Sequence, residues 1–155
     1  MQRETGTVIS GSVALRILDT DAAWKPNDYD LYVRHSQWER VLHYLCTLNG
    51  NVLETVIDGT GEETYESPYP WLNQGIDRMA KIRGPHANID LMRSRNESAL
   101  YPICFFWSTI VMNILTADEI ISAYPTHVQQ HRAFCSPTIE GTQLAAKAKY
   151  VERGF

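Results

Sequence analysis

A Gly-Ser pair near the start of the chain limits how its first segments can fold. The β-prone run Thr7-Val8-Ile9-Ser10 stops at Gly11-Ser12, and the apolar residues that follow, from Val13 to Leu18, have helical spacing. This order predicts a strand, a tight turn and a helix. Backbone N–H groups and the dipole at the start of such a helix favour a phosphate, and Ser12 adds a hydroxyl donor. Taken alone, the dipeptide is equally explained by an ordinary turn with a Ser helix cap.

Two carboxylates begin the next predicted strand, Asp28–Val33, which follows the break at Pro26-Asn27. Because side chains alternate along a strand, Asp28 and Asp30 share one face with Tyr32. Like charges this close repel unless a cation or strong donors neutralise them, and carboxylate oxygens suit Mg²⁺ or Mn²⁺. An Asp that caps the turn and an Asp exposed on an edge strand would explain the pair without a metal. The upstream Gly-Ser turn favours the metal interpretation.

A third carboxylate, Asp90, lies within a predicted hairpin. Strands are expected at Arg78–Arg83 and Asn88–Met92, and the short connection 84–87 suits an antiparallel pair. Asp90 stands between two apolar residues, so its side chain points to the face opposite theirs, as a metal ligand on a neighbouring strand would. An exposed strand Asp is the other explanation.

Four further patterns predict mostly helix for the rest of the chain. Trp38 to Leu48 forms an amphipathic helix that should cover one face of the sheet, and Phe105 to Leu115 is apolar on all sides, as in a buried helix. Thr116 to Glu119 has the spacing of a capping box for the next helix, and a last helix is expected over Thr142 to Arg153. The segment Asp58 to Pro70 reads as a long loop. The predicted fold class is α+β, with a helical C-terminal part.

Size and charge exclude several classes of protein. The 155 residues suffice for one domain, 1–155, with a single core. A net charge of −4 gives no general attraction to nucleic acid, so we expect no strong non-specific DNA binding. The three cysteines have no short spacing, which fits free thiols in a reducing compartment. No apolar run is long enough to span a membrane and the start lacks a signal peptide, so the expected location is cytoplasmic.

The two motifs together resemble the nucleotidyltransferase superfamily typified by DNA polymerase β. The resemblance rests on Ile9-Ser10-Gly11-Ser12-Val13-Ala14-Leu15 and on Asn27-Asp28-Tyr29-Asp30-Leu31-Tyr32-Val33. Among the branches of the superfamily, the chain is most similar to uncharacterised fungal proteins and to bacterial abortive-infection-type transferases. The resemblance implies a mixed β-sheet flanked by helices.

The resemblance also implies roles for individual residues. Asp28 and Asp30 match the metal-binding pair, Asp90 matches the third carboxylate that helps activate the acceptor, and Gly11 with Ser12 matches the phosphate-binding turn. Bacterial members often carry an Arg just before the Asp pair, where this chain has Lys25 as the replacement.

Basic residues surround Asp90 in the sequence. They could meet a triphosphate or a nucleic-acid acceptor, or they could be solvated strand and loop charges. Of these we take Lys81 as the candidate for the nucleotide side. The group consists of Arg78, Lys81, Arg83, Arg93 and Arg95.

The residues therefore predict a metal-dependent nucleotidyltransferase. It would move a nucleoside monophosphate from a nucleoside triphosphate such as ATP onto an acceptor, releasing pyrophosphate, with Mg²⁺ or Mn²⁺ as cofactor. The acceptor class stays open between RNA, protein and a small molecule. The rival hypothesis is a catalytically silent protein of the same fold that binds a nucleotide, a protein or RNA, as in a toxin-antitoxin pair.

Overall fold

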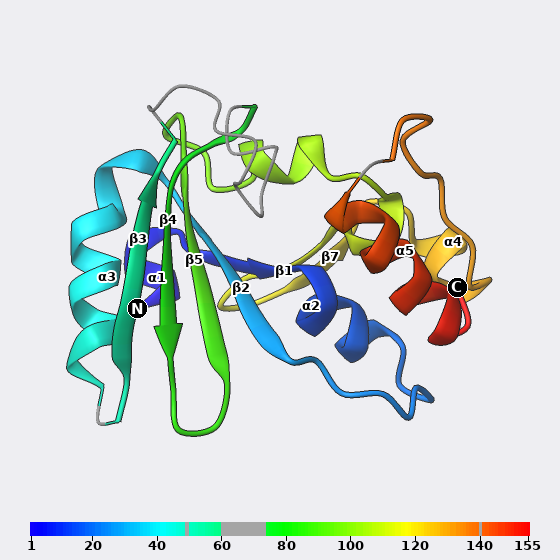
Figure 1. The fold of residues 1–155 in the computed structure, drawn as a ribbon, viewed down its shortest axis with the longest axis horizontal. Helices are drawn as coiled ribbons and strands as arrows, with labels where there is room; N and C mark the ends of the chain where they lie inside the picture. The colour runs from blue at the N-terminus through cyan, green and yellow to red at the C-terminus, as the bar shows by residue number, and fades with distance from the viewer. Residues whose placement is uncertain (49, 60–73, 140) are drawn as a thin grey trace.

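The computed structural model describes residues 1–48, 50–59, 74–139 and 141–155. These residues form an α+β protein built on one mixed sheet (Figure 1). The strands are β1 (Val8–Ser10), β2 (Asp28–Val33), β3 (Val52–Asp58), β4 (Ile76–Arg83), β5 (Asn88–Ser94), β6 (Asn113–Leu115) and β7 (Ile120–Ser122). The helices are α1 (Gln2–Thr5), α2 (Gly11–Leu18), α3 (Trp38–Thr47), α4 (Pro125–Gln129) and α5 (Thr142–Glu152).

The sheet of the described residues has seven strands in the order β3-β4-β5-β2-β1-β6-β7. Strands β2 and β5 pair in parallel, and the other neighbours pair antiparallel. The parallel pair lies at the middle of the sheet, with β4 next to β5 on one side and β1 next to β2 on the other. Asp28 and Asp30 are therefore on a central strand, and not on an edge strand.

One face of the sheet is apolar and is covered by α3. Trp38, Val41 and Leu45 of the helix pack with strand residues of β2, β4 and β5, among them Leu31 and Leu91. Burial of these large apolar side chains is the main favourable contribution to this half of the fold. Leu31 alternates with Asp30 and Tyr32 along β2, so the apolar layer forces Asp30 onto the opposite face.

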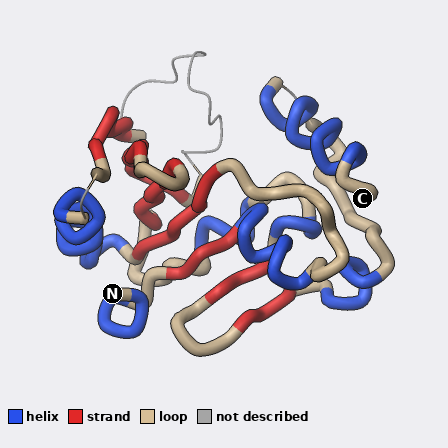
Figure 2. Tube along the Cα trace, turned by 90° about the horizontal axis from the view of Figure 1, so that it is seen from below, coloured by secondary structure: helices blue, strands red, loops and turns tan. Residues whose placement is uncertain are grey.

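The opposite face is covered by segments from later in the chain. Tyr32 and Met92 pack there with Ile103, which lies in a 3₁₀ turn at Tyr101–Phe105. A separate cluster joins Leu15 of α2 to Tyr150 of α5. Both ribbon views place α3 at one end of the molecule and α5 at the other (Figures 1 and 2).

The structure confirms the predicted elements of the first half. The strand, turn and helix around Gly11-Ser12 are β1 and α2, the Asp28–Val33 strand is β2, and the helix from Trp38 is α3. The predicted hairpin is β4 and β5, and the C-terminal helix is α5. A short helix, α1, and the strand β3 were not predicted. Most of the predicted loop, from residue 60 onward, lies outside the described residues.

The helix predicted over Phe105–Leu115 is wrong. A 3₁₀ turn ends at Phe105, a second one spans Thr109–Val111, and Asn113–Leu115 is strand β6. The continuous apolar run reflects burial on several sides, and burial alone does not distinguish a helix from short turns and a strand. The prediction that helices dominate the second half is wrong for the same reason.

The helix predicted after Thr116 is also wrong, because this segment is the turn between β6 and β7. The Thr116 hydroxyl accepts a hydrogen bond from the Glu119 N–H at 2.9 Å, as in a capping box. The Thr116 N–H, however, donates to the Glu119 carbonyl at 2.9 Å and closes a hairpin. The β-branched Ile120 and Ile121 that follow favour a strand.

The helices of the described residues are short. None of them has the length and apolar character needed to cross a membrane.

Candidate active site

A row of polar residues crosses the face of the sheet that α3 leaves uncovered. Ser10 of β1 lies opposite Asp30 of β2, Asp30 lies opposite Asp90 of β5, and Asp90 lies opposite Lys81 of β4. Residues directly opposite each other on paired strands point to the same face. The register of four strands therefore brings together two of the three predicted carboxylates and one predicted lysine.

The Gly-Ser turn lies against the second carboxylate of the Asp pair. Gly11 has φ +67°, a conformation that favours glycine, and a Cβ built on it would overlap Asp30 Oδ2 and lie 3.2 Å from Asp30 Cγ. Only a residue without a side chain fits between the β1–α2 turn and β2 in this arrangement. The positive φ and the close approach of Asp30 therefore both require glycine at position 11.

The turn and the Asp pair form one side of a pocket of about 290 Å³. The lining residues on this side are Gly11, Ser12, Asp28 and Asp30. The other described lining residues are mainly apolar or aromatic and come from β2, the start of β4, β5, the segment after β5, and α5; they include Tyr32, Ile76, Met92, Phe105, Phe106, Trp107 and Tyr150. The pocket thus places a polar, acidic wall beside an aromatic one, which suits a ligand with a charged part and a planar part.

The electrostatics of the pocket centre on Asp30. The pKa of Asp30 is raised from 3.8 to about 8, first by burial and then by the charges of Asp28 and Asp90, while the charge of Lys149 opposes the shift. Without a bound cation Asp30 is therefore largely protonated near neutral pH. A divalent cation would remove this repulsion, because it favours the ionised form of each carboxylate that it contacts.

Ser10 and Ser12 have different environments on either side of Gly11. The Ser10 hydroxyl donates to the Asn113 carbonyl at 2.6 Å, which ties the end of β1 to β6. Ser12 Oγ is buried, has no hydrogen-bond partner among the described residues, and belongs to a side chain that lines the pocket. Buried hydroxyls are usually paired, so an unpaired one at the first turn of a helix is available for a ligand after a rotation about χ1.

Asp90 is not among the described residues that line the pocket with Asp28 and Asp30. It is buried, and its Oδ2 lies 4.0 Å from Lys81 Nζ. Within the described residues, no group of three or more His, Cys, Asp or Glu side chains is arranged to hold a metal ion. The carboxylate oxygens of Asp28 and Asp30 suit Mg²⁺ or Mn²⁺. A metal site that includes Asp90 as well stays a prediction, and it would require side chains of these residues to move.

The two lysines predicted for the nucleotide side lie away from the pocket. Lys25 is exposed on the connection between α2 and β2, and Lys81 contacts Asp90. Neither is among the described residues that line the pocket. Their contact with a nucleotide stays a prediction.

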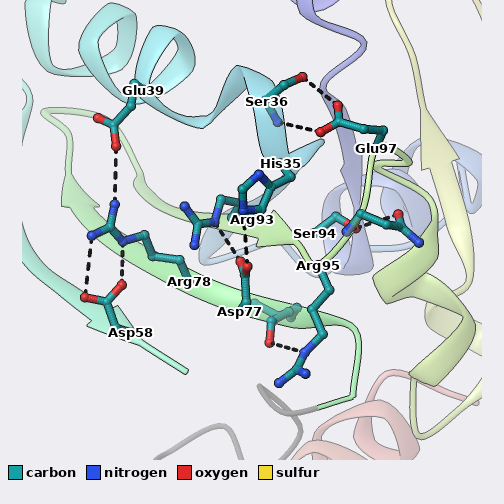
Figure 3. Close-up of polar contacts among 12 residues, drawn as sticks. His35, Ser36, Glu39, Asp58, Asp77, Arg78, Arg93, Ser94, Arg95 and Glu97 are labelled. Carbon is teal, nitrogen blue, oxygen red and sulfur yellow. Dashed lines mark hydrogen bonds and ion pairs between the residues drawn. The ribbon is translucent and has the colours of Figure 1, made fainter. Parts of the chain in front are cut away.

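Three of the four arginines around Asp90, namely Arg78, Arg83 and Arg93, have acidic partners. Arg78 donates to Asp58 at 2.5 Å, and Arg93 donates to Asp77 at 2.7 Å (Figure 3). Arg83 lies 3.5 Å from Glu54. These pairs favour the interpretation of the arginines as balanced surface charge over that of a basic surface for nucleic acid.

Sequence reasoning missed the contribution of the last helix to the pocket. Lys149 and Tyr150 of α5 line it, as does Trp107. Burial raises the pKa of Tyr150, as do the charges of Asp30 and Asp28, while Arg153 opposes the shift. The amphipathic pattern predicted α5 itself, but no local pattern indicates that it lies over the Asp pair.

The chain is thus an α+β protein with a central mixed sheet and an acidic, aromatic pocket at the end of β1 and the start of β2. No protein-family model matches the sequence, and no curated protein is significantly similar to it.

Proposed function

We propose that this protein is a metal-dependent nucleotidyltransferase of the DNA polymerase β-like fold. The observation that carries the proposal is the placement of Gly11, Ser12, Asp28 and Asp30 in one pocket. A turn that can bind phosphate and a carboxylate pair that can bind a divalent ion are the two parts that such a reaction needs at one place.

Each residue would have a distinct role toward the nucleotide. The N–H groups of the first turn of α2 and the Ser12 hydroxyl donate to phosphate oxygens. Asp28 and Asp30 hold a divalent ion, which supplies positive charge to the phosphates and lowers the pKa of the acceptor. The aromatic wall, with Trp107 and Tyr150, leaves room for a planar base.

The reaction would balance without any further reactant. An acceptor oxygen attacks the α-phosphorus, the bond between the α-phosphorus and the bridging oxygen breaks, and pyrophosphate leaves. Asp90 takes the proton of the acceptor hydroxyl, because it is the remaining carboxylate in the row with Asp30.

A second candidate is a catalytically silent protein of the same fold. Two observations favour it: the described residues hold no ready-made three-ligand metal site, and the pKa of Asp30 is about 8. Such a protein would bind a nucleotide in the pocket without transferring any part of it.

Incubation with α-labelled nucleoside triphosphates tests the two candidates. Each triphosphate is mixed with Mg²⁺ or Mn²⁺ and with separate pools of RNA, protein and small metabolites. A transferase labels one pool, and that pool identifies the acceptor class. Nucleotide binding without label in any pool supports the silent protein.

A further inference from the structure

The helix α5 brings a positive charge to the pocket that the Asp pair also lines. Ala146, Lys149 and Tyr150 recur at helical spacing and all line the pocket. Of the described lining residues, Lys149 alone carries a positive charge. Figure 1 shows α5 beside α2, the helix that begins at the Gly-Ser turn.

Lys149 lines the same pocket as the carboxylates of Asp28 and Asp30. Its ammonium lies 5.3 Å from the centre of the Tyr150 ring, and no salt bridge links it to a described acidic residue. The ammonium is therefore available for an anion that enters the pocket.

Residues on the same helix hold the backbone beneath Lys149 in place. Tyr150 is buried against Leu15 of α2, and the Arg153 guanidinium lies 4.1 Å from the centre of the Trp24 ring. These contacts fix α5 to the connection between α2 and β2. The position of Lys149 relative to the Gly-Ser turn thus follows from packing, although its own side chain is exposed.

We propose that Lys149 binds the phosphate chain of the nucleoside triphosphate, in the role that the sequence suggested for Lys25 or Lys81. This inference rests on the proposed function. A triphosphate keeps net negative charge when it carries one divalent ion, and the wall formed by Asp28 and Asp30 does not attract it without that ion. A second cation in the pocket compensates the remaining charge, and it can stabilise the charge that develops on the leaving pyrophosphate.

Calorimetric titration with Mg²⁺ tests the proposal, using inorganic tripolyphosphate and a nucleoside triphosphate as separate ligands. Lys149→Ala should weaken both by about ten- to a hundredfold, which is the loss expected for one hydrogen bond to a charged group. Lys147→Ala is the matched control: it removes the same charge from the same helix, also at an exposed position, but Lys147 does not line the pocket. Lys149→Arg should retain most of the affinity.

The outcomes separate this inference from the proposed function. Equal affinity in the parent, Lys147→Ala and Lys149→Ala proteins would overturn the role of Lys149 and leave the proposed function standing. Equal losses in both alanine variants would also overturn it, because they would indicate a general effect of charge. A loss confined to the nucleoside triphosphate would assign Lys149 to the base side and overturn the contact with phosphate. A parent protein that binds neither ligand would refute the proposed function itself.

Discussion

The carboxylate of Asp30 lies against the backbone of Gly11, so closely that a methyl group at position 11 would overlap it. This contact joins the β1–α2 turn to the Asp pair on β2. The two motifs of the sequence are therefore one structural unit.

The contact predicts a large cost for Gly11→Ala. Gly6 is the matched control, because it has the same φ of +67° but no atom within 4 Å of an added Cβ. Gly6→Ala should lower the free energy of unfolding by about 1 kcal/mol, from backbone conformation alone. Gly11→Ala should lower it by roughly 2–4 kcal/mol, since Asp30 must also move. Urea unfolding of both variants measures the difference, and equal costs would show that the contact is unimportant.

The raised pKa of Asp30 predicts that the metal-free protein loses stability as the pH rises. The folded state keeps the proton up to a pKa of about 8, whereas the unfolded chain releases it near 3.8. Between these values the folded state binds more protons, so the free energy of unfolding falls with rising pH. The two pKa values lie about four units apart, so the fall should reach on the order of 5 kcal/mol, and Asp30→Asn should remove it.

Urea midpoints measured with a chelator across this pH range test the prediction. Asp21→Asn, at an exposed position, is the control and should retain the parent's slope. A parent protein whose stability rises from about pH 5 to pH 8 would contradict the environment assigned to Asp30.

Ser12→Ala should have opposite effects on binding and on stability. The hydroxyl has no partner among the described residues, so its removal should leave the free energy of unfolding unchanged or slightly higher. Affinity for a nucleoside triphosphate should fall by about 0.5–1.5 kcal/mol, the value of one hydrogen bond. Urea unfolding and nucleotide titration measure the two effects. Unchanged affinity would indicate that Gly11-Ser12 is an ordinary turn that does not bind phosphate.

Metal binding should depend on the Asp pair together. We expect calorimetry to detect Mg²⁺ or Mn²⁺ binding that strengthens as the pH rises toward 8, because the ion competes with the proton on Asp30. Asp28→Asn combined with Asp30→Asn should abolish it. If the double variant binds metal as tightly as the parent, the ion is held elsewhere.

The helices and strands that were predicted correctly are those whose pattern lies in a short stretch of neighbouring residues. The aromatic and aliphatic residues that follow the break at Pro26-Asn27 indicated β2, and the apolar spacing from Trp38 indicated α3. The failure at Thr116 has a clear physical cause: its hydroxyl makes the same bond to the Glu119 N–H in a turn as in a helix. Strand β3 was missed because nearly all of its side chains are exposed, so no buried face marks it.

The part of the candidate site that the sequence predicted is likewise the part formed by short motifs. Gly11 and Ser12 begin α2 directly after β1, and Asp28 and Asp30 lie on the neighbouring strand β2, so each motif is continuous in the sequence. Lys149 reaches the pocket through the packing of α5, and no short spacing relates it to the Asp pair. Register brought Asp90 beside Asp30, but its contact with Lys81 depends on a third strand.

The fate of the α- and γ-phosphates of a nucleoside triphosphate tests nucleotidyl transfer most directly. Parent and Asp90→Asn proteins are incubated with α-labelled or γ-labelled triphosphate, Mg²⁺ or Mn²⁺, and the acceptor pool. We predict that the parent places α-label on the acceptor and γ-label in pyrophosphate. Asp90→Asn should still bind nucleotide but lose most transfer, because an amide cannot take the acceptor's proton. Label from the γ-phosphate on the acceptor, or nucleotide binding with no transfer of either label by the parent, would contradict the proposed function.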